Sequence, residues 1–195
     1  MRQWLAPIAG GLVAAGLGFW LVLNWVPGFL MDKALGRLTS FGPGYNQVFH
    51  GPITDETSRR VVRPSPDILY SVCAYDLTES NVELSVPWPS NGSYASVSFY
   101  DANTNNFEVV SDRQQEQLGN IDGDEAETSI VLFHMRSTAT PVTIAALRDG
   151  RDMQIASPTS TGLALYRRVL MGDTPIEQVD QERRAFSCNA IATNS

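Results

Sequence analysis

Residues 83–100 read ELSVPWPSNGSYASVSFY and carry the strongest fold signal in the chain. Within 83–88, and again within 94–100, apolar residues alternate with polar ones, which is typical of a strand with one buried face. Between the two runs lies Asn91-Gly92, a strong hairpin signal because both residues tolerate a positive φ. We therefore expect an antiparallel hairpin that joins 83–89 to 94–101.

Similar strand patterns occur on both sides of this hairpin. A run rich in β-branched and aromatic residues precedes it, and turn residues separate several short apolar runs after it. Short strands at this spacing predict an antiparallel β-sandwich or jelly-roll-like domain. The further strands are expected at 68–77, 107–110, 128–135, 142–147 and 153–156.

The C-terminal part of the sequence favours helices. Leu163, Val169 and neighbouring apolar residues predict a helix over 159–171 that stops at Gly172. The run Thr174-Pro175-Ile176-Glu177 has the pattern of a capping box, and it predicts a second helix from Pro175 to about 186. The predicted fold class is mainly β with two C-terminal helices.

The N-terminus predicts one transmembrane helix. No charged residue occurs over 3–31, and the apolar core over 4–23 is long enough to cross a hydrocarbon layer of ~30 Å. Trp4 lies near one end, and Trp20 and Trp25 lie near the other, where indole rings prefer the headgroup level. We expect the helix to end near Pro27.

A cleaved signal peptide is the alternative reading of this run. Its apolar core is shorter, and a pair of small residues marks its cleavage site. The sequence after Leu23 contains no such pair, so we expect a retained anchor. The expected organisation is an anchor over 1–31, a juxtamembrane helix and irregular linker over 32–66, and the β-sandwich with its C-terminal helices over 67–195.

Charge and cysteine content narrow the class of protein. The net charge of −7 disfavours a nucleic-acid binder, which needs a basic surface, so we expect no nucleic-acid partner. The two cysteines, Cys73 and Cys188, either form one disulfide in an oxidising compartment or remain separate thiols. Their spacing to histidine is not that of a zinc site, and no phosphate-binding loop, nucleophile elbow or dinucleotide fingerprint occurs. We expect no metal and no cofactor.

Two polar-aromatic stretches, 63–71 and 99–107, are the candidates for a binding site. On a structural reading both are turns, because Asp and Asn side chains bond to nearby backbone. On a functional reading they form one polar pocket at an end of the sheet. Its candidate residues are Arg63, Asp67, Tyr70, Asp101, Asn105 and Asn106.

A stripe of small residues lies on the transmembrane segment. Gly10, Ala14 and Gly18 recur at every fourth position, which lets a second helix approach closely. The stripe is a candidate helix-docking face, although Gly and Ala are also common in such helices without a partner.

Several stretches resemble the motifs of a known family. Residues 63–71, RPSPDILYS, resemble the RPNPDTLYS signature of the bacterial domain-of-unknown-function family DUF1254, with Ser65 and Ile68 as the departures. Residues 76–87, 96–107 and 157–170 resemble further motifs of the family in the same order. The resemblance covers about 60–172. It implies a β-sandwich and a common surface around the motifs, often beside a sister domain of unknown function, but no known reaction. We expect this chain to be too short to hold that sister domain as well, so it resembles the short, membrane-anchored form.

Three functional hypotheses remain open at this stage. The leading one is a periplasmic binding or accessory module on a single-pass anchor in the bacterial inner membrane, with the N-terminus cytoplasmic. Its partners are the lipid bilayer and either a membrane protein, the sister-domain protein, or an envelope glycan or lipid. The second is an envelope hydrolase or lyase, in which Asp67 or Asp101 acts as acid or base and Tyr70 or Arg63 stabilises charge. The third is a structural subunit of a membrane complex. Without a catalytic signature, the sequence favours a protein that is not an enzyme.

Overall fold

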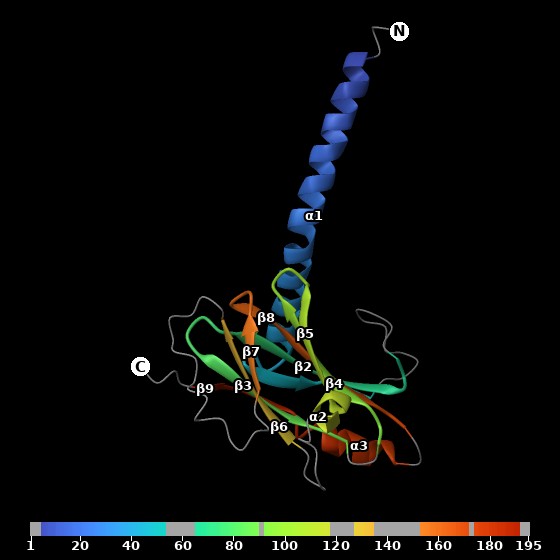
Figure 1. Cartoon of the computed structure of the whole chain (residues 1–195), viewed down its shortest axis with the longest axis vertical. Coiled ribbons are helices and arrows are strands. Elements are labelled where there is room, and N and C mark those ends of the chain that lie inside the picture. The colour runs from blue at the N-terminus through green and yellow to red at the C-terminus, as the bar shows by residue number, and fades with distance from the viewer. Residues whose placement is uncertain are drawn as a thin grey trace.

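Two β-sheets and a long N-terminal helix make up the computed structural model (Figure 1). It describes residues 5–53, 65–89, 92–117, 127–134, 153–171 and 174–191. Arg63 and the strand expected at 142–147 lie outside these residues. The helices are α1 (Leu5–Phe41), α2 (Asp112–Gln117) and α3 (Ile176–Arg183). The strands are β1 (Gln47–His50), β2 (Ile68–Asp76), β3 (Asn81–Pro87), β4 (Ala95–Asp101), β5 (Asn106–Ser111), β6 (Glu127–His134), β7 (Met153–Ser157), β8 (Thr161–Val169) and β9 (Ser187–Ile191).

The strands form a five-stranded sheet in the order β1-β2-β8-β4-β5 and a four-stranded sheet in the order β7-β6-β3-β9. All neighbouring strands are antiparallel except β6 and β7, which pair in parallel, so the second sheet is mixed. The hydrophobic core lies between the sheets. It contains Tyr75 and Phe99 from the first sheet and Leu84 and Leu132 from the second, all fully buried. The predicted mainly-β, sandwich-like class is confirmed.

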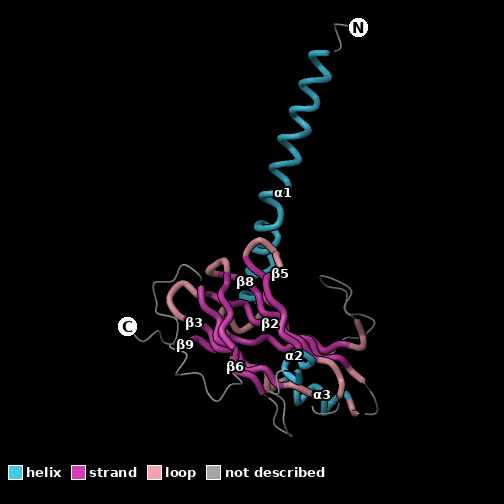
Figure 2. Tube along the Cα trace, in the orientation of Figure 1, coloured by secondary structure: helices cyan, strands magenta, loops and turns pink. Residues whose placement is uncertain are grey.

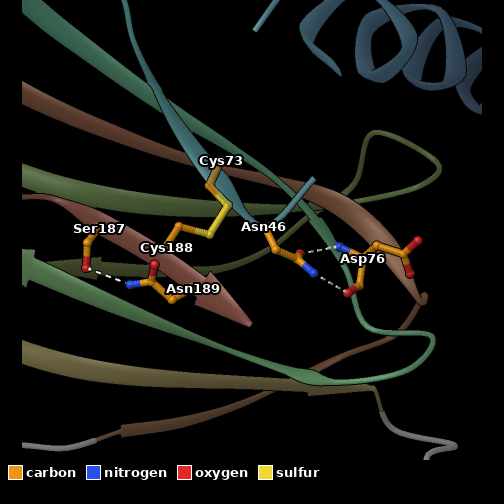
Figure 3. Close-up of a disulfide and its surroundings, with 6 residues drawn as sticks. All are labelled: Asn46, Cys73, Asp76, Ser187, Cys188 and Asn189. Carbon is orange, nitrogen blue, oxygen red and sulfur yellow. Dashed lines mark hydrogen bonds between the residues drawn. A yellow bond between two sulfur atoms is a disulfide. The ribbon is translucent and has the colours of Figure 1, made fainter. Parts of the chain in front are cut away.

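A disulfide joins the two sheets across this core (Figure 3). Cys73 lies on β2 and Cys188 on β9, 115 positions apart in sequence, and their Cα atoms are 6.4 Å apart. Of the two alternatives for the cysteines, the structure has the bridge. It therefore ties the end of the chain to the other sheet.

The expected hairpin at Asn91-Gly92 is wrong. Gly92 has the positive φ of +73° that the turn signal implies, but β3 and β4 belong to different sheets. β3 pairs with β6 and β9, and β4 pairs with β5 and β8. Pro87 and Pro89 explain the difference, because neither has the amide donor that a ladder needs next to its turn. The chain crosses between sheets here.

The helix expected over 159–171 is also wrong, because this segment is β8. Its burial alternates along the strand, with Ala164, Tyr166 and Arg168 facing the core, whereas Leu163 and Leu165 face outward. β8 lies at the centre of its sheet and carries large side chains on both faces, so its apolar pattern is nearly continuous and mimics a helix.

The second C-terminal helix is confirmed as α3. Its cap differs from the prediction, since Pro175 is the N-cap residue and no side chain caps the helix. β1 falls within the stretch expected to be an irregular linker, and β9 and α2 were not expected.

α1 is one continuous helix that runs through Pro27, against the expectation that it ends there. A proline removes one hydrogen bond from the ladder, and α1 continues past it. Before Pro27 its apolar side chains are exposed, and it is long and apolar enough to cross a membrane. After Pro27, Met31 and Leu35 are buried against Ala74, Tyr100 and Leu163 on the outer face of the five-stranded sheet. Figure 2 shows the first half of α1 projecting from the sheets.

Candidate functional site

The two motif loops lie at opposite ends of the five-stranded sheet, so the prediction of one shared pocket is wrong. β8 pairs with both strands concerned, Ile68 opposite Val169 and Asp101 opposite Gly162. Seven residues of strand separate those positions, which is roughly 23 Å. β2 and β4 flank β8 and run parallel to each other, so the start of one lies far from the end of the other. Asp67 and Asp101 do not form an acid–base pair.

Asp101 organises the turn between β4 and β5. Its Oδ1 accepts hydrogen bonds from the backbone N–H groups of Asn103 and Asn105, both at 2.8 Å, and its Oδ2 accepts one from Asn105 Nδ2 at 2.9 Å. The carboxylate is buried, and Thr104 takes a φ of +67° within the turn. Asn106 is exposed at the start of β5. This use of the Asp101 side chain is structural.

The same turn lies beside α1, as Figure 1 shows near β5. A Cβ added to Gly28 would lie 3.4 Å from Asn103 Oδ1. The turn therefore touches the helix one residue after Pro27, where α1 begins to contact the sheet domain.

At the other end, the described part of the 63–71 motif has mainly backbone roles. Asp67 has an exposed side chain, and its carbonyl oxygen accepts a hydrogen bond from the backbone N–H of Leu170 at 2.8 Å. Tyr70 is half-buried, and its hydroxyl accepts a bond from the backbone N–H of Ser65 at 3.4 Å. Its carbonyl oxygen accepts bonds from Gly51 and from the Arg183 guanidinium.

Two buried arginines hold α3 against this end of the domain. Arg168 on β8 pairs with Glu182 at 3.0 Å, and Arg183 pairs with Asp180 and donates to Gly51 O at 2.9 Å. Both guanidinium groups are almost fully buried, and each has a carboxylate partner, as buried charges require. The sequence reading missed them because Arg168 and Glu182 lie on different elements, and Arg183 also donates to Gly51 O and Tyr70 O far away in sequence.

A polar row crosses the outer face of the five-stranded sheet. Arg167 on β8 lies opposite Tyr70 on β2 and Ser96 on β4, and Ser96 lies opposite Ser111 on β5. Cross-strand partners point to the same face, so we call these four residues the polar row. Three of the four stretches that resemble family motifs supply Tyr70, Ser96 and Arg167. The sequence contained the residues but not the strand order that aligns them.

A polar pocket of about 290 Å³ opens at the end of β2. Asn46 holds this end in place, since its side chain donates to Asp76 O at 2.9 Å and accepts from Asp76 N at 2.7 Å (Figure 3). Burial raises the pKa of the Tyr45 hydroxyl, and the negative charges of Asp76 and of Asp32 on α1 raise it further. The lining residues are Tyr45, Asn46, Asp76, Thr78, Glu79 and Ser80.

The Gly10, Ala14 and Gly18 stripe lies on the exposed part of α1. A Cβ added to Gly10 or Gly18 would meet nothing within 4 Å. A helix partner for this stripe stays a prediction.

Fold and motifs together define a β-sandwich protein that carries an apolar N-terminal helix. The family model described as "Protein of unknown function (DUF1254)" matches residues 45–190, and the chain belongs to this family. No curated protein matches it.

Two solved structures are similar to the chain. The VPA0106 protein from Vibrio parahaemolyticus is 12% identical with a TM-score of 0.58, and the match covers 87% of this chain and 37% of that one. An uncharacterized protein from Burkholderia cenocepacia is 17% identical with a TM-score of 0.49, covering 85% of this chain and 40% of the other. This chain thus spans well under half the length of either, and the first likeness shows the fold alone.

Proposed function

We propose that this protein is a membrane-anchored binding module whose sheet domain is held at the periplasmic surface of the bacterial inner membrane. The observation that carries the proposal is the division of α1 into two halves. The half before Pro27 exposes its apolar side chains, and the half after it packs Met31 and Leu35 on the sheet domain. An exposed apolar helix is unfavourable in water but suits a bilayer.

The length of α1 supports a domain held close to the membrane surface. Its 37 residues span about 55 Å, and a bilayer core takes about 30 Å of that. The remainder is the half that contacts the β4–β5 turn and the outer face of the sheet. The domain therefore rests on the headgroups without a flexible stalk.

The disulfide favours the periplasm over the cytoplasm. Disulfides persist in oxidising compartments and are rare where thiols are kept reduced. The Cys73–Cys188 bridge lies within the core of the domain. A periplasmic domain leaves the short N-terminal end of α1 on the cytoplasmic side.

The pocket at the end of β2 is the binding site that we favour. Asp32, whose charge acts on Tyr45, is the first charged residue after the apolar run, so the pocket lies near the point where the chain leaves the membrane. Its lining combines carboxylate, amide and hydroxyl groups with the half-exposed ring of Tyr45. Carboxylates repel anions but accept hydrogen bonds from hydroxyl groups. The ligand class that fits is an uncharged, hydroxyl-rich molecule such as an envelope glycan.

Titration of the full-length protein in detergent micelles with a soluble N-acetylglucosamine oligosaccharide tests this pocket. We expect saturable binding that Glu79→Gln weakens by ~5-fold or more, because a hydrogen bond to a charged group is lost. Glu108→Gln, at an exposed carboxylate on β5, is the matched control and should bind as the wild type does. Absence of binding to the wild type would reject the glycan ligand.

The anchor and its orientation need a separate experiment. Alkaline carbonate extraction should leave the protein in the membrane pellet, and protease added to spheroplasts should cleave the sheet domain. Protection of the domain until the inner membrane is lysed would place it in the cytoplasm. Recovery of a soluble form lacking α1 would reject the anchor.

A further inference from the structure

Arg167, at the centre of the polar row, differs from the other buried arginines of this domain. It alternates along β8 with Tyr166 and Arg168, which face the core, so Arg167 faces outward. Arg168 and Arg183 each pair with a carboxylate on α3. Among the described residues no carboxylate pairs with Arg167, although its side chain is partly buried.

Most of the N–H groups of Arg167 have no acceptor in the part of the chain that the structure describes. A guanidinium has five N–H donors. Arg167 uses one, from Nη2 to Ser98 Oγ at 3.0 Å, and its buried Nε has no acceptor among the described residues. A partly buried cation without a counter-charge is costly, and the cost is removed when an anion binds.

Ser96, beside Arg167, is a second polar group on this face that lacks a hydrogen-bond partner among the described residues. It is the cross-strand partner of Arg167, it is 0% exposed, and its Oγ has no hydrogen-bond partner among the described residues. A buried hydroxyl without a partner destabilises the fold. Arg167 Nε–H and Ser96 Oγ–H are both donors on neighbouring strands of one face, so one oxygen atom between them would satisfy both.

We propose that the polar row is a binding site for a small oxyanion, a group with the shared chemistry of carboxylate and phosphate. Arg167 supplies the charge and Ser96 a neutral donor, and the partly exposed side of Arg167 leaves a path from solvent. A bound water would also satisfy the two donors, but it would not compensate the charge. The site is separate from the acidic pocket at the end of β2, and it does not depend on the function proposed for that pocket.

Calorimetric titration of the full-length protein in detergent micelles tests the proposal, with sodium phosphate in one arm and sodium acetate in the other at matched ionic strength. We expect one saturable site in at least one arm, and the tighter arm identifies the tetrahedral or the planar anion. Arg167→Gln should weaken that binding ~10-fold or more, since charge-assisted hydrogen bonds are lost. Arg184→Gln, which removes a mostly exposed arginine directly after α3, should leave it unchanged.

Ser96→Ala separates binding from stability. Removing an unpartnered hydroxyl should leave the melting temperature without anion equal to or above that of the wild type, while anion affinity falls. In the wild type, the Arg167 Nε–H resonance should shift on titration, a readout that needs no variant. The proposal is overturned if Arg167→Gln binds the anion as strongly as the wild type does, or if the Nε–H resonance does not move at saturating anion. Water would then be the partner of the two donors.

Discussion

Gly162, at the start of β8, leaves room for a hydrogen bond between two other strands. The Tyr75 hydroxyl donates to Tyr100 O at 2.9 Å, and a Cβ on residue 162 would lie 2.2 Å from both oxygen atoms. Gly162→Ala must therefore push the strands apart or break this bond. We expect a loss of ~2 kcal/mol or more in the free energy of unfolding, measured by denaturant titration. Gly36→Ala, on α1 with open space around it, is the control and should cost nothing.

The Tyr75 hydroxyl also predicts how stability depends on alkaline pH. Burial raises the pKa of Tyr75 to about 12 from the value of 10.0 expected when the chain is unfolded. Between these values the folded state keeps a proton that the unfolded state releases, so stability is complete below pH 10 and falls as the pH rises toward 12. We expect Tyr75→Phe to make the fall in melting temperature between pH 10 and 12 shallower. An identical slope in both proteins would contradict this assignment.

Residue patterns in the sequence identified most strands but not all of their roles. Ile68–Asp76 and Met153–Ser157 follow from β-branched and alternating residues, because that signal is local. The turn made by Asp101 also follows from local chemistry, because its side chain bonds Asn103 and Asn105 nearby in the chain. The position of Arg167 does not, because Arg167 meets Ser96 only where β4 and β8 are neighbours.

At the scale of the element, the docked half of α1 determines how firmly the helix holds the sheet domain. Leu35 is 4% exposed against the sheet, and Leu30 is 56% exposed on the same helix. We expect Leu35→Ala to weaken docking by ~2 kcal/mol, through the lost burial and the cavity left behind. Hydrogen exchange in 31–41 should become faster in Leu35→Ala and stay unchanged in Leu30→Ala. Equal exchange in the two variants would mean that Leu35 does not hold the helix.

β8 shows where element prediction from this sequence reaches its limit. A short run with large apolar residues at successive positions fits a helix or a strand that is covered on both faces. The choice depends on the neighbours, since β2 and β4 pair with β8 on its two sides and α1 covers one end of its outer face. None of those partners is adjacent in sequence.

For the whole molecule, the Cys73–Cys188 bridge is a disulfide cross-link between the two sheets. Its two cysteines are 115 residues apart, and closing a loop of this length restricts the unfolded chain by ~4–5 kcal/mol in the entropy model. We expect Cys73→Ala and Cys188→Ala to lower the free energy of unfolding by similar amounts, and reductant to destabilise the wild type alone. Free thiols in the denatured, unreduced protein would contradict the bridge.

Local chemistry in the amino-acid sequence was enough for the apolar helix, most of the strands, the mainly-β class and the family motifs. Each of these features depends on residues close together in the chain. The signal is the period of the apolar residues, the length of an apolar run or the spacing of residues in a motif. The folded molecule was needed to assign β3 and β4 to different sheets and to identify β8 as a strand. It was also needed to separate Asp67 from Asp101. The polar row around Arg167 required it too. These features depend on which strands pair and in which direction, and strand pairing is settled by contacts between residues far apart in sequence, through burial of a common core that no short stretch encodes.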